Sequence, residues 1–257
     1  MCLITVGVQL RADLPLVLAA NRDEFFARAT QAAQFWPDAP ELLAGRDLEQ
    51  GGTWMGLTRS GRIAAVTNFR DGGRPRSGRR SRGWLVRDFL MSERDPEHYV
   101  RELQGECDQY DGFNLLAGVA ERIYYCSNRG GAPHLLSPGV HGLSNHLVNT
   151  PWPKVELAKA GLAALVDAPA ELLVERLFEL LADERRAHDD ELPRTGVSLE
   201  WERVLSSAFI RTADYGTRSS TVVLLHANGQ ALFEERAFDA DGSQTHRRRY
   251  ELPPFSL

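Results

Sequence analysis

The pattern of apolar and polar positions predicts short strands joined by tight turns over most of the chain. Apolar or β-branched stretches occur in neighbouring pairs, and each pair is separated by polar residues or glycine. The pairs are 2–8 with 14–20, 53–57 with 62–68, 114–119 with 123–127, and 219–225 with 230–238. The last pair flanks Asn228-Gly229, the strongest short hairpin signal in the sequence. We therefore expect four β-hairpins.

Two blocks with a helical period of apolar residues separate these hairpins. The first predicts helices at 83–91 and 96–104, where Pro96 suits a helix start. In the second block, apolar residues recur at helical spacing after Pro153 and again after Pro169. This order of strands and helices is typical of an α+β domain in which helices cover two antiparallel sheets. With 257 residues and no linker or repeat, we expect a single domain, 1–257.

Composition narrows the class of protein. The longest apolar stretches fall far short of the roughly 20 residues that a membrane span needs, and no leader precedes Cys2, so we expect a cytoplasmic protein. The formal net charge of −5 argues against nucleic-acid binding. Three cysteines without a CxxC pair, and seven scattered histidines, predict neither a disulfide framework nor a metal site.

Cys2 is the strongest chemical feature of the sequence. A small residue after Met1 permits removal of that methionine, which would leave Cys2 with a free α-amine. The thiol has an ordinary pKa of about 8.5 and the α-amine one of about 8, so the amine can accept the proton of the thiol. The pair forms a nucleophile with its own base. The alternative interpretation is a small apolar residue buried at the start of a strand.

Four polar residues, Asn21-Arg22-Asp23-Glu24, follow the strand that is expected to pair with the one holding Cys2. An arginine near the thiol would favour the thiolate, and a carboxylate there would orient the α-amine. A hydrogen-bonded turn at the end of a strand explains the same residues equally well.

With this tetrapeptide, four further motifs give the chain a resemblance to the NRDE family, whose eukaryotic members are the transport-and-Golgi-organisation proteins. The motifs are Met1-Cys2, Gly51-Gly52-Thr53-Trp54, Val66-Thr67-Asn68-Phe69-Arg70 and Tyr215-Gly216-Thr217-Arg218. The family is in turn similar to the N-terminal nucleophile hydrolases, especially choloylglycine hydrolase and penicillin V acylase. That similarity implies a four-layer αββα sandwich, in agreement with the layered pattern above.

The resemblance also implies roles for individual residues. Cys2 is similar to the nucleophile and Asp23 to the acid that orients the N-terminus, while Asn68 and Asn145 resemble the two asparagines of an oxyanion hole. Arg22 and Arg218 complete the implied catalytic set. Residues expected to contact the ligand are Asn21, Trp54, Arg70 and His146. The hydrolases separate the arginine and the acid by two or three residues. Here Arg22 directly precedes Asp23, which places the two side chains on opposite faces of a strand.

Two classes of function fit these residues. The first is a Cys2-dependent amidohydrolase or acyltransferase that acts on a small amide or acyl substrate and needs no cofactor. The alternative is a carrier of haem, acyl-CoA or another lipid, which the family resemblance implies, with Cys2, His141 or His146 as an axial ligand of haem. Segment 70–82 holds six arginines and one acid, and is either a solvated loop or a flap that grips an anion.

Overall fold

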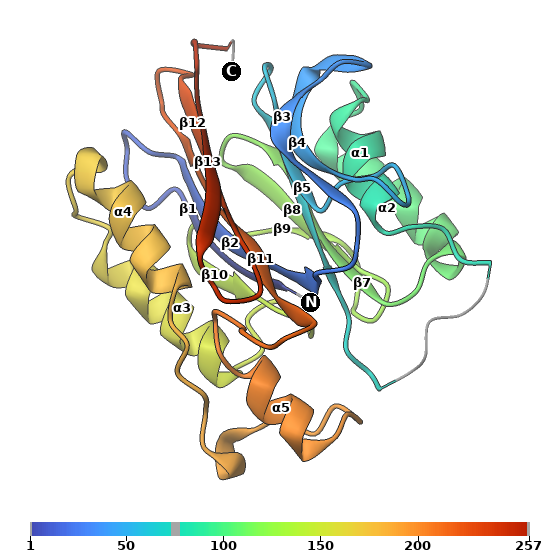
Figure 1. Ribbon diagram of the computed structural model, residues 1–257. Coiled ribbons are helices and arrows are strands. Elements are labelled where there is room, and N and C mark those ends of the chain that lie inside the picture. Colours follow the sequence, from blue (N-terminus) through green and yellow to red (C-terminus); the bar gives the residue numbers. More distant parts are fainter. Residues whose placement is uncertain (1, 73–77, 256–257) are drawn as a thin grey trace.

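The structure, a computed structural model, describes residues 2–72 and 78–255 (Figure 1). Two antiparallel sheets pack face to face, and helices cover the outer face of each, in the layer order αββα. The α+β class and the four-layer sandwich predicted from the sequence are therefore confirmed. Arg74 and Arg76, which belong to the arginine-rich segment, lie outside the described residues.

The first sheet has six strands and contains the first and the last strand of the chain. Its spatial order is β10 (Gly139–Leu143), β1 (Cys2–Val8), β2 (Leu16–Phe25), β11 (Tyr215–Leu225), β12 (Ala231–Phe238) and β13 (Gln244–Leu252). The hairpins β1–β2 and β11–β12 are those that the sequence predicts. Strand β2 is longer than expected and includes Asn21-Arg22-Asp23-Glu24, because all four residues pair with β11 and the first two also pair with β1. The tetrapeptide is thus part of a strand and not a terminal turn.

The second sheet has seven strands that follow one another in chain order. They are β3 (Thr30–Trp36), β4 (Ala39–Asp47), β5 (Met55–Thr58), β6 (Arg62–Asn68), β7 (Phe113–Val119), β8 (Arg122–Ser127) and β9 (His134–Leu135). The hairpins β5–β6 and β7–β8 agree with the prediction. The hairpin β3–β4 has no clear signal in the sequence, because its pairing is interrupted between Gln31 and Gln34 and most of β3 is only half-buried.

Five α-helices and two short 3₁₀ helices complete the fold among the described residues. Their bounds are α1 (Gly83–Leu90), α2 (Pro96–Leu103), α3 (Pro153–Ala164), α4 (Ala170–Leu181), α5 (Leu199–Leu205), η1 (Gln104–Gln109) and η2 (Asp189–Glu191). Helices α1 and α2 pack on the second sheet, and α3 and α4 pack on the first. The side chain of Asp95 caps α2 by accepting hydrogen bonds from two backbone amides, which fixes the start that Pro96 predicts. Within the described part of the chain, every helix is too short or too polar to cross a bilayer.

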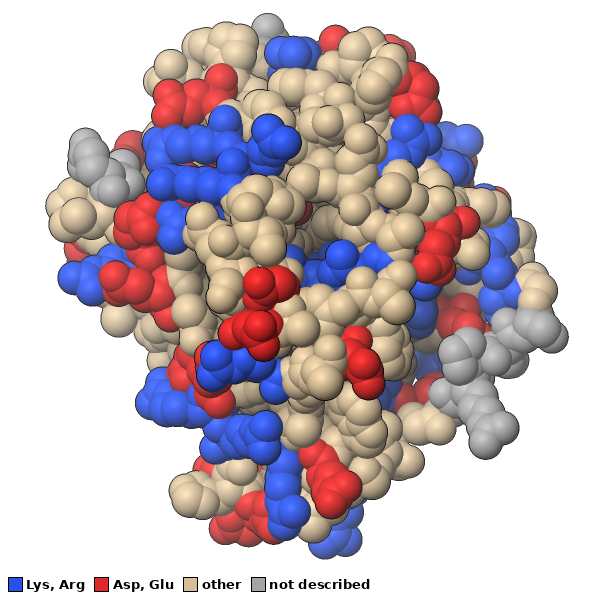
Figure 2. All heavy atoms as spheres, in the orientation of Figure 1, with Lys and Arg blue, Asp and Glu red and all other residues tan. Residues whose placement is uncertain are grey.

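Alternation along β1 and β2 decides which layer each side chain meets. Ile4 and Leu18 belong to the apolar core between the sheets, whereas Ala19 faces the helices. Cys2 and Arg22 continue the inner row, and Asp23 belongs to the outer row. The inner row therefore changes from apolar to polar at one end of the sandwich. On the face shown in Figure 2, acidic and basic side chains are intermixed, and a hollow near the centre has Lys or Arg at its edge.

Candidate functional site

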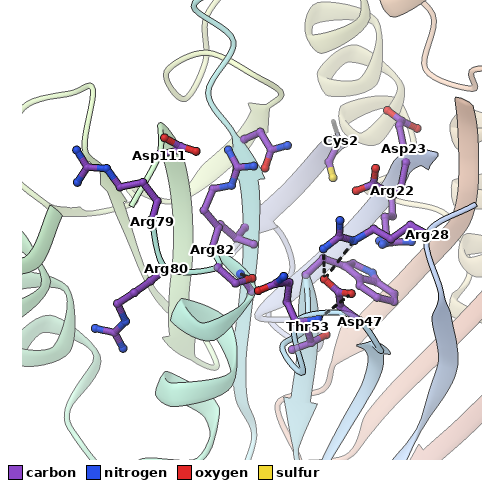
Figure 3. A pocket seen from close by; sticks show the side chains of 17 residues that line it. Cys2, Arg22, Asp23, Arg28, Asp47, Thr53, Arg79, Arg80, Arg82 and Asp111 are labelled. Atoms are coloured by element: carbon purple, nitrogen blue, oxygen red, sulfur yellow. Dashed lines mark hydrogen bonds and ion pairs between the residues drawn. The ribbon is translucent and has the colours of Figure 1, made fainter. Parts of the chain in front are cut away.

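A cavity of about 310 Å³ lies at the end of the sandwich where β1 begins and β2 ends (Figure 3). Its walls are the paired ends of these strands, the connection between β4 and β5, the end of β6, and the segment that leads into α1. The charged residues on the walls are Arg22, Asp23, Glu24, Arg28, Asp47, Arg79, Arg80, Arg82 and Asp111. Arginines outnumber carboxylates, and Cys2 places a thiol among them.

Cys2 is the first residue of β1, and its backbone is held from both sides. It pairs in register with Arg22, and its carbonyl accepts a hydrogen bond of 2.9 Å from Ser144 Oγ. Burial raises the pKa of the Cys2 thiol and the charge of Asp23 raises it further, whereas Arg22 lowers it. Arg22 therefore acts in the direction expected from the sequence, but the net shift of the thiol pKa is upward.

Arg22 lies on the same face of the sheet as Cys2 and is stacked on an indole ring. Its guanidinium carbon is 4.1 Å from the centre of the Trp54 ring. The indole fits there because Gly45 of β4 has no side chain, since a Cβ on Gly45 would lie 2.3 Å from a ring atom of Trp54. Arg22 Nη1 donates to Thr30 Oγ1 at 3.4 Å, and within residues 2–72 and 78–255 Arg22 forms no ion pair. Its charge is thus available to the cavity.

Asp23 lies on the helix side of β2, in a cluster of buried polar groups. Its Oδ1 accepts a hydrogen bond of 2.7 Å from Thr217 Oγ1. Burial raises the pKa of Asp23, while the nearby ammonium of Lys154 opposes that shift. Lys154 comes from the first turn of α3, and burial lowers its pKa to about 8. Lys154 Nζ is buried and has no hydrogen-bond partner in the part of the chain that the structure describes. The sequence-based site did not include this lysine.

Arg70, which follows β6, is buried in an ion pair with α5. Its Nη1 donates to Glu202 Oε2 at 2.7 Å, and its guanidinium lies over the Trp152 ring, 4.7 Å from the centre. Arg70 Nη2 also donates to Asn145 Oδ1 at 3.4 Å, and Asn145 Nδ2 donates to the backbone carbonyl of Asn68 at 3.0 Å. Asn68 borders the cavity, so the structure brings it together with Cys2. Asn145 contacts the backbone of Asn68, and its side-chain oxygen accepts from Arg70.

Two other residues of the expected set fix backbone around the site. Asn21 Nδ2 donates to the carbonyls of Leu181 and Ala208, both at 2.8 Å, and so joins β2 to the end of α4 and to the segment before β11. Arg218 Nη1 donates to the carbonyl of Phe25 at 3.1 Å and also to that of Arg28, which holds the segment that follows β2. Both side chains make these contacts with backbone away from the Cys2 thiol.

The histidines proposed as haem ligands are engaged elsewhere. His146 Nδ1 is 2.9 Å from Thr150 Oγ1, and its ring packs against Phe69 with the ring centres 4.8 Å apart. His141 Nε2 is 2.8 Å from the carbonyl of Ser137. Among the residues described, neither histidine lines the cavity at Cys2, and no cluster of three His, Cys, Asp or Glu side chains with metal-binding geometry is present. The described part of the pocket brings no second axial ligand to Cys2, so the lining residues that the structure describes do not fit a haem iron held from both sides.

The other arginines around the cavity differ in their partners. Arg28 forms an ion pair of 2.7 Å with Asp47 (Figure 3), and Arg80 forms one of 2.9 Å with Glu106. Arg82 Nη1 donates to the carbonyl of Gly112 at 3.1 Å, and Arg82 has no ion-pair partner in ranges 2–72 and 78–255. Among the described residues, Arg22, Arg79 and Arg82 are therefore the wall arginines that combine a half-buried or buried position with no ion pair, and the Arg79 side chain points away from Cys2 (Figure 3).

A close contact between two backbones fixes the wall that carries Arg82. A Cβ on Gly52 would lie 2.6 Å from the carbonyl carbon of Gly83, and the amide of Thr53 donates to the oxygen of that carbonyl at 3.2 Å. Only glycine permits this approach. The Gly51-Gly52-Thr53-Trp54 motif thus positions two arginines at once, Arg22 through the indole and Arg82 through the start of α1.

A sequence signal for Lys154 does exist. Lys154, Ala158 and Leu162 are spaced four residues apart and form one row on α3, and all three are buried. A lysine in a row that is otherwise apolar indicates a buried charge with a special environment. Glu202 has no comparable signal, because α5 was not predicted as a helix.

A family model and the sequences of known proteins match this chain and indicate the same family. Residues 1–240 match the family described as Transport and Golgi organisation 2. The chain is 40% identical over 242 residues to the Transport and Golgi organization protein 2 homolog of Bos taurus, covering 86% of each chain. It is 35% identical over 260 residues to the Homo sapiens homolog, covering 92% of each. The Drosophila melanogaster protein is 32% identical, with 86% of this chain and 85% of that one covered.

Solved structures with a similar course of the chain share little sequence with it. One is an N-acylethanolamine-hydrolyzing acid amidase ortholog from Caenorhabditis elegans, with 11% identity, a TM-score of 0.48, and 87% of this chain and 92% of that one covered. Another is a mutant conjugated bile acid hydrolase from Clostridium perfringens, with 11% identity, a TM-score of 0.42, and 100% and 99% covered. It is the sequence match over nearly the whole length that decides the family: the chain belongs to the Transport and Golgi organisation 2 family.

Proposed function

We propose that this protein is an N-terminal nucleophile type amidohydrolase or acyltransferase, with Cys2 as the nucleophile and a small amide or acyl compound as the substrate. One observation carries the proposal. The Cys2 thiol borders a cavity of about 310 Å³, with an arginine beside it that has no ion pair among the described residues and a buried carboxylate at the adjacent strand position. A cavity of that size is at the lower end of the range for small-molecule sites.

The reaction needs the α-amine of Cys2, so whatever precedes Cys2 must be removed first. The free amine then takes the thiol proton while sulfur attacks the substrate carbonyl and forms a tetrahedral intermediate. When that intermediate collapses, the bond to the leaving group breaks, the ammonium returns the proton to the leaving group, and a thioester remains on Cys2. Water or another acceptor then cleaves the thioester and restores the thiol. Atoms and protons balance without a cofactor.

The surrounding residues have defined roles in this proposal. Arg22 favours the thiolate against the cost of burial, and Asp23 orients the α-amine. Asn68 supplies an oxyanion donor, a contribution that is typically about 3 kcal/mol per donor. Asn145 positions Asn68 through the hydrogen bond to its backbone carbonyl, and Arg218 and Asn21 position the end of β2.

The test combines mass spectrometry with a thiol-free variant. Purified protein is analysed by intact mass to establish whether the chain begins at Cys2, and is then incubated with a panel of small acyl amides and thioesters. We expect substrate-dependent acyl adducts on Cys2 and turnover that Cys2→Ala abolishes. Cys107→Ser, on a half-buried cysteine of η1, should retain turnover. Active protein that keeps a residue before Cys2 would exclude the α-amine as base.

The second candidate is a carrier that binds an acyl compound, a lipid or haem without turning it over. Wall arginines in excess of carboxylates suit an anionic ligand whether or not a reaction follows. Stoichiometric binding of a ligand that survives unchanged, together with wild-type binding by Cys2→Ser, would favour the carrier. For haem, the readout is a Soret shift that Cys2→Ala removes. The reduced thiol that the enzyme requires agrees with the cytoplasmic location expected from the sequence.

A further inference from the structure

We propose that Arg82 binds an anionic group of the substrate, a carboxylate or a phosphate, next to the carbonyl that Cys2 attacks. This inference rests on the proposed function and narrows its substrate class to acyl compounds that carry a negative charge. Arg82 is then a specificity-determining residue through its contact with the substrate anion, in addition to its electrostatic interaction with the Cys2 thiol.

The position of Arg82 supports this role. Figure 3 shows the Cys2 thiol between Arg22 on one side of the cavity and Arg82 on the other. The Arg82 side chain is half-buried and anchored through Nη1, which donates to the Gly112 carbonyl at 3.1 Å. An anchored guanidinium has further N–H donors in a fixed fork, the geometry that matches carboxylate and phosphate oxygens.

Among the described residues, Arg82 lacks the ion pair that Arg28 and Arg80 have, and Arg79, which also lacks one, points away from Cys2 (Figure 3). Arg28 is paired with Asp47, and Arg80 is paired with Glu106, whereas Arg82 has no ion pair among the described residues. Burial lowers the pKa of Arg82, and Asp111 and Glu24 oppose that shift from beyond ion-pair distance. Arginine remains charged under such conditions, so its burial is costly until a counter-charge arrives.

A neutral substrate would increase the free-energy cost of burying the Arg82 charge. A neutral acyl chain that fills the cavity displaces water from Arg82 and offers no acceptor to the N–H groups other than the one bound to the Gly112 carbonyl, which opposes binding. An anion placed between Arg82 and Arg22 replaces the lost water with charge-assisted hydrogen bonds. The same residue therefore attracts anionic substrates and rejects neutral ones.

The experiment measures this selectivity on the Cys2 thiol itself. Cys2 is alkylated with iodoacetate, which is anionic, or with iodoacetamide, which is neutral and of nearly the same size, and the two rate constants are read by peptide mass spectrometry. That reading separates Cys2 from Cys107 and Cys126. We expect the ratio of the iodoacetate to the iodoacetamide rate constant to exceed that of a cysteine in an uncharged peptide. Arg82→Gln should lower the ratio about three- to tenfold.

Arg80→Gln is the matched control. It removes the same charge from a neighbouring side chain whose guanidinium points away from Cys2 (Figure 3), and it should keep the wild-type ratio within about twofold. Inorganic phosphate and acetate are then added as competitors of iodoacetamide. If phosphate alone protects Cys2 from iodoacetamide, the anionic group of the substrate is a phosphate. If acetate also protects Cys2, the site accepts a carboxylate as well.

A ratio equal to that of the peptide, or an equal fall in both variants, would overturn the role of Arg82. Alkylation needs neither turnover nor a free α-amine, so the result stands apart from the proposed hydrolysis. Absence of turnover with an intact, Arg82-dependent ratio would refute the enzyme and keep the anion site. Turnover of neutral substrates at a rate that Arg82→Gln leaves unchanged would support the enzyme and refute the anion site.

Discussion

The two faces of β2 end in polar groups of opposite character. On the inner face, Arg22 meets a cavity and lies beside the Cys2 thiol. On the outer face, Asp23 is closed in with Lys154 and Thr217, and the ion pair between Arg70 and Glu202 lies close by. One strand thus separates a site that a ligand can enter from a network that holds the elements around it.

The difference lies in how each charge is satisfied. Glu202 accepts from the Arg70 guanidinium and from both the amide and the hydroxyl of Thr195, at 2.6 to 2.8 Å. The Arg22 guanidinium, in contrast, stacks on the Trp54 ring and donates one long hydrogen bond to Thr30 Oγ1. A fully satisfied network contributes rigidity, while an under-satisfied charge is available for binding or for tuning a neighbouring group. Substitutions in the buried network on the outer face should therefore change stability, and substitutions of inner-face residues that border the cavity should change reactivity.

The largest expected effect is on the outer face. Glu202→Gln keeps the shape but leaves the Arg70 charge buried without a counter-ion, which typically costs about 3 to 5 kcal/mol of unfolding free energy. Urea unfolding followed by fluorescence measures it. Asp189→Asn breaks an exposed ion pair with Arg203 and is the control, with an expected change below about 1 kcal/mol. Similar losses in the two variants would contradict the contrast between the faces.

The next effect tests a buried carboxyl that lies on the inner face but away from solvent. Burial raises the pKa of Glu235 from an ordinary 4.5 to about 7. Its proton is therefore held more tightly in the folded state, so the associated stability is complete below about pH 4.5 and is lost as the pH rises through about 7. Glu235→Gln can keep the 2.7 Å acceptor contact with the Ala33 amide.

We expect Glu235→Gln to be more stable than the wild type by about 1 to 3 kcal/mol at pH 8 and nearly equal to it at pH 4.5. Unfolding free energies at several pH values between these limits measure the difference. A variant that is less stable at pH 8 would show that the ionised carboxylate is a favourable partner of Arg22.

The third effect is on reactivity at the inner face. Arg22 lowers the pKa of the Cys2 thiol, so Arg22→Gln should raise it and slow alkylation of Cys2 by iodoacetamide about three- to tenfold at pH 8. The rate should still rise with pH, because burial places the thiol pKa above its ordinary value. Unfolding free energy should change by less than about 1 kcal/mol. If Arg22→Gln caused a large loss of unfolding free energy and no change in the alkylation rate, the role assigned to the inner face would be wrong.

The smallest expected effect is that of Lys154, on the outer face of the sheet, on the alkylation rate of Cys2, on the inner face. Lys154 on the outer face interacts electrostatically with both Asp23 and Cys2. Removing its charge in Lys154→Met should raise the thiol pKa slightly and slow alkylation about two- to threefold at pH 7. Near pH 9 the difference should vanish, since the Lys154 pKa is about 8 and the wild-type side chain is then neutral. A pH-independent difference would assign the effect to packing.

The fold could be predicted where local chemistry is strong. Asn228-Gly229 and Pro153 mark a hairpin and a helix start on their own, and the structure has both. Strands β3 and β13 lie near sheet edges and carry mixed polar residues, so their alternation is weak and the prediction omitted them. Strand β2 was predicted too short, because only pairing with β11, almost two hundred residues later, keeps the polar tetrapeptide extended.

The site could be predicted only in part. The motifs Met1-Cys2 and Asn21-Arg22-Asp23-Glu24 point to the end of β1 and β2, and adjacency in sequence correctly separates Arg22 from Asp23 by face. The partners that set their electrostatics come from segments remote in the chain. Lys154 reaches Asp23 from α3 and Glu202 reaches Arg70 from α5, contacts that depend on how whole layers pack. Whether the site turns over a substrate remains a prediction for the experiments above.

The hydrogen bond from Ser144 Oγ to the Cys2 carbonyl has a consequence for maturation. Newly exposed chain ends usually fray, because their backbone groups lose neighbours. Cys2 is tied through its carbonyl to the segment after β10 and through strand pairing to Arg22, and the carbonyl contact does not involve the preceding peptide bond. Cleavage before Cys2 would thus yield a terminus that is already ordered, so that processing changes the chemistry of this residue while its position stays fixed.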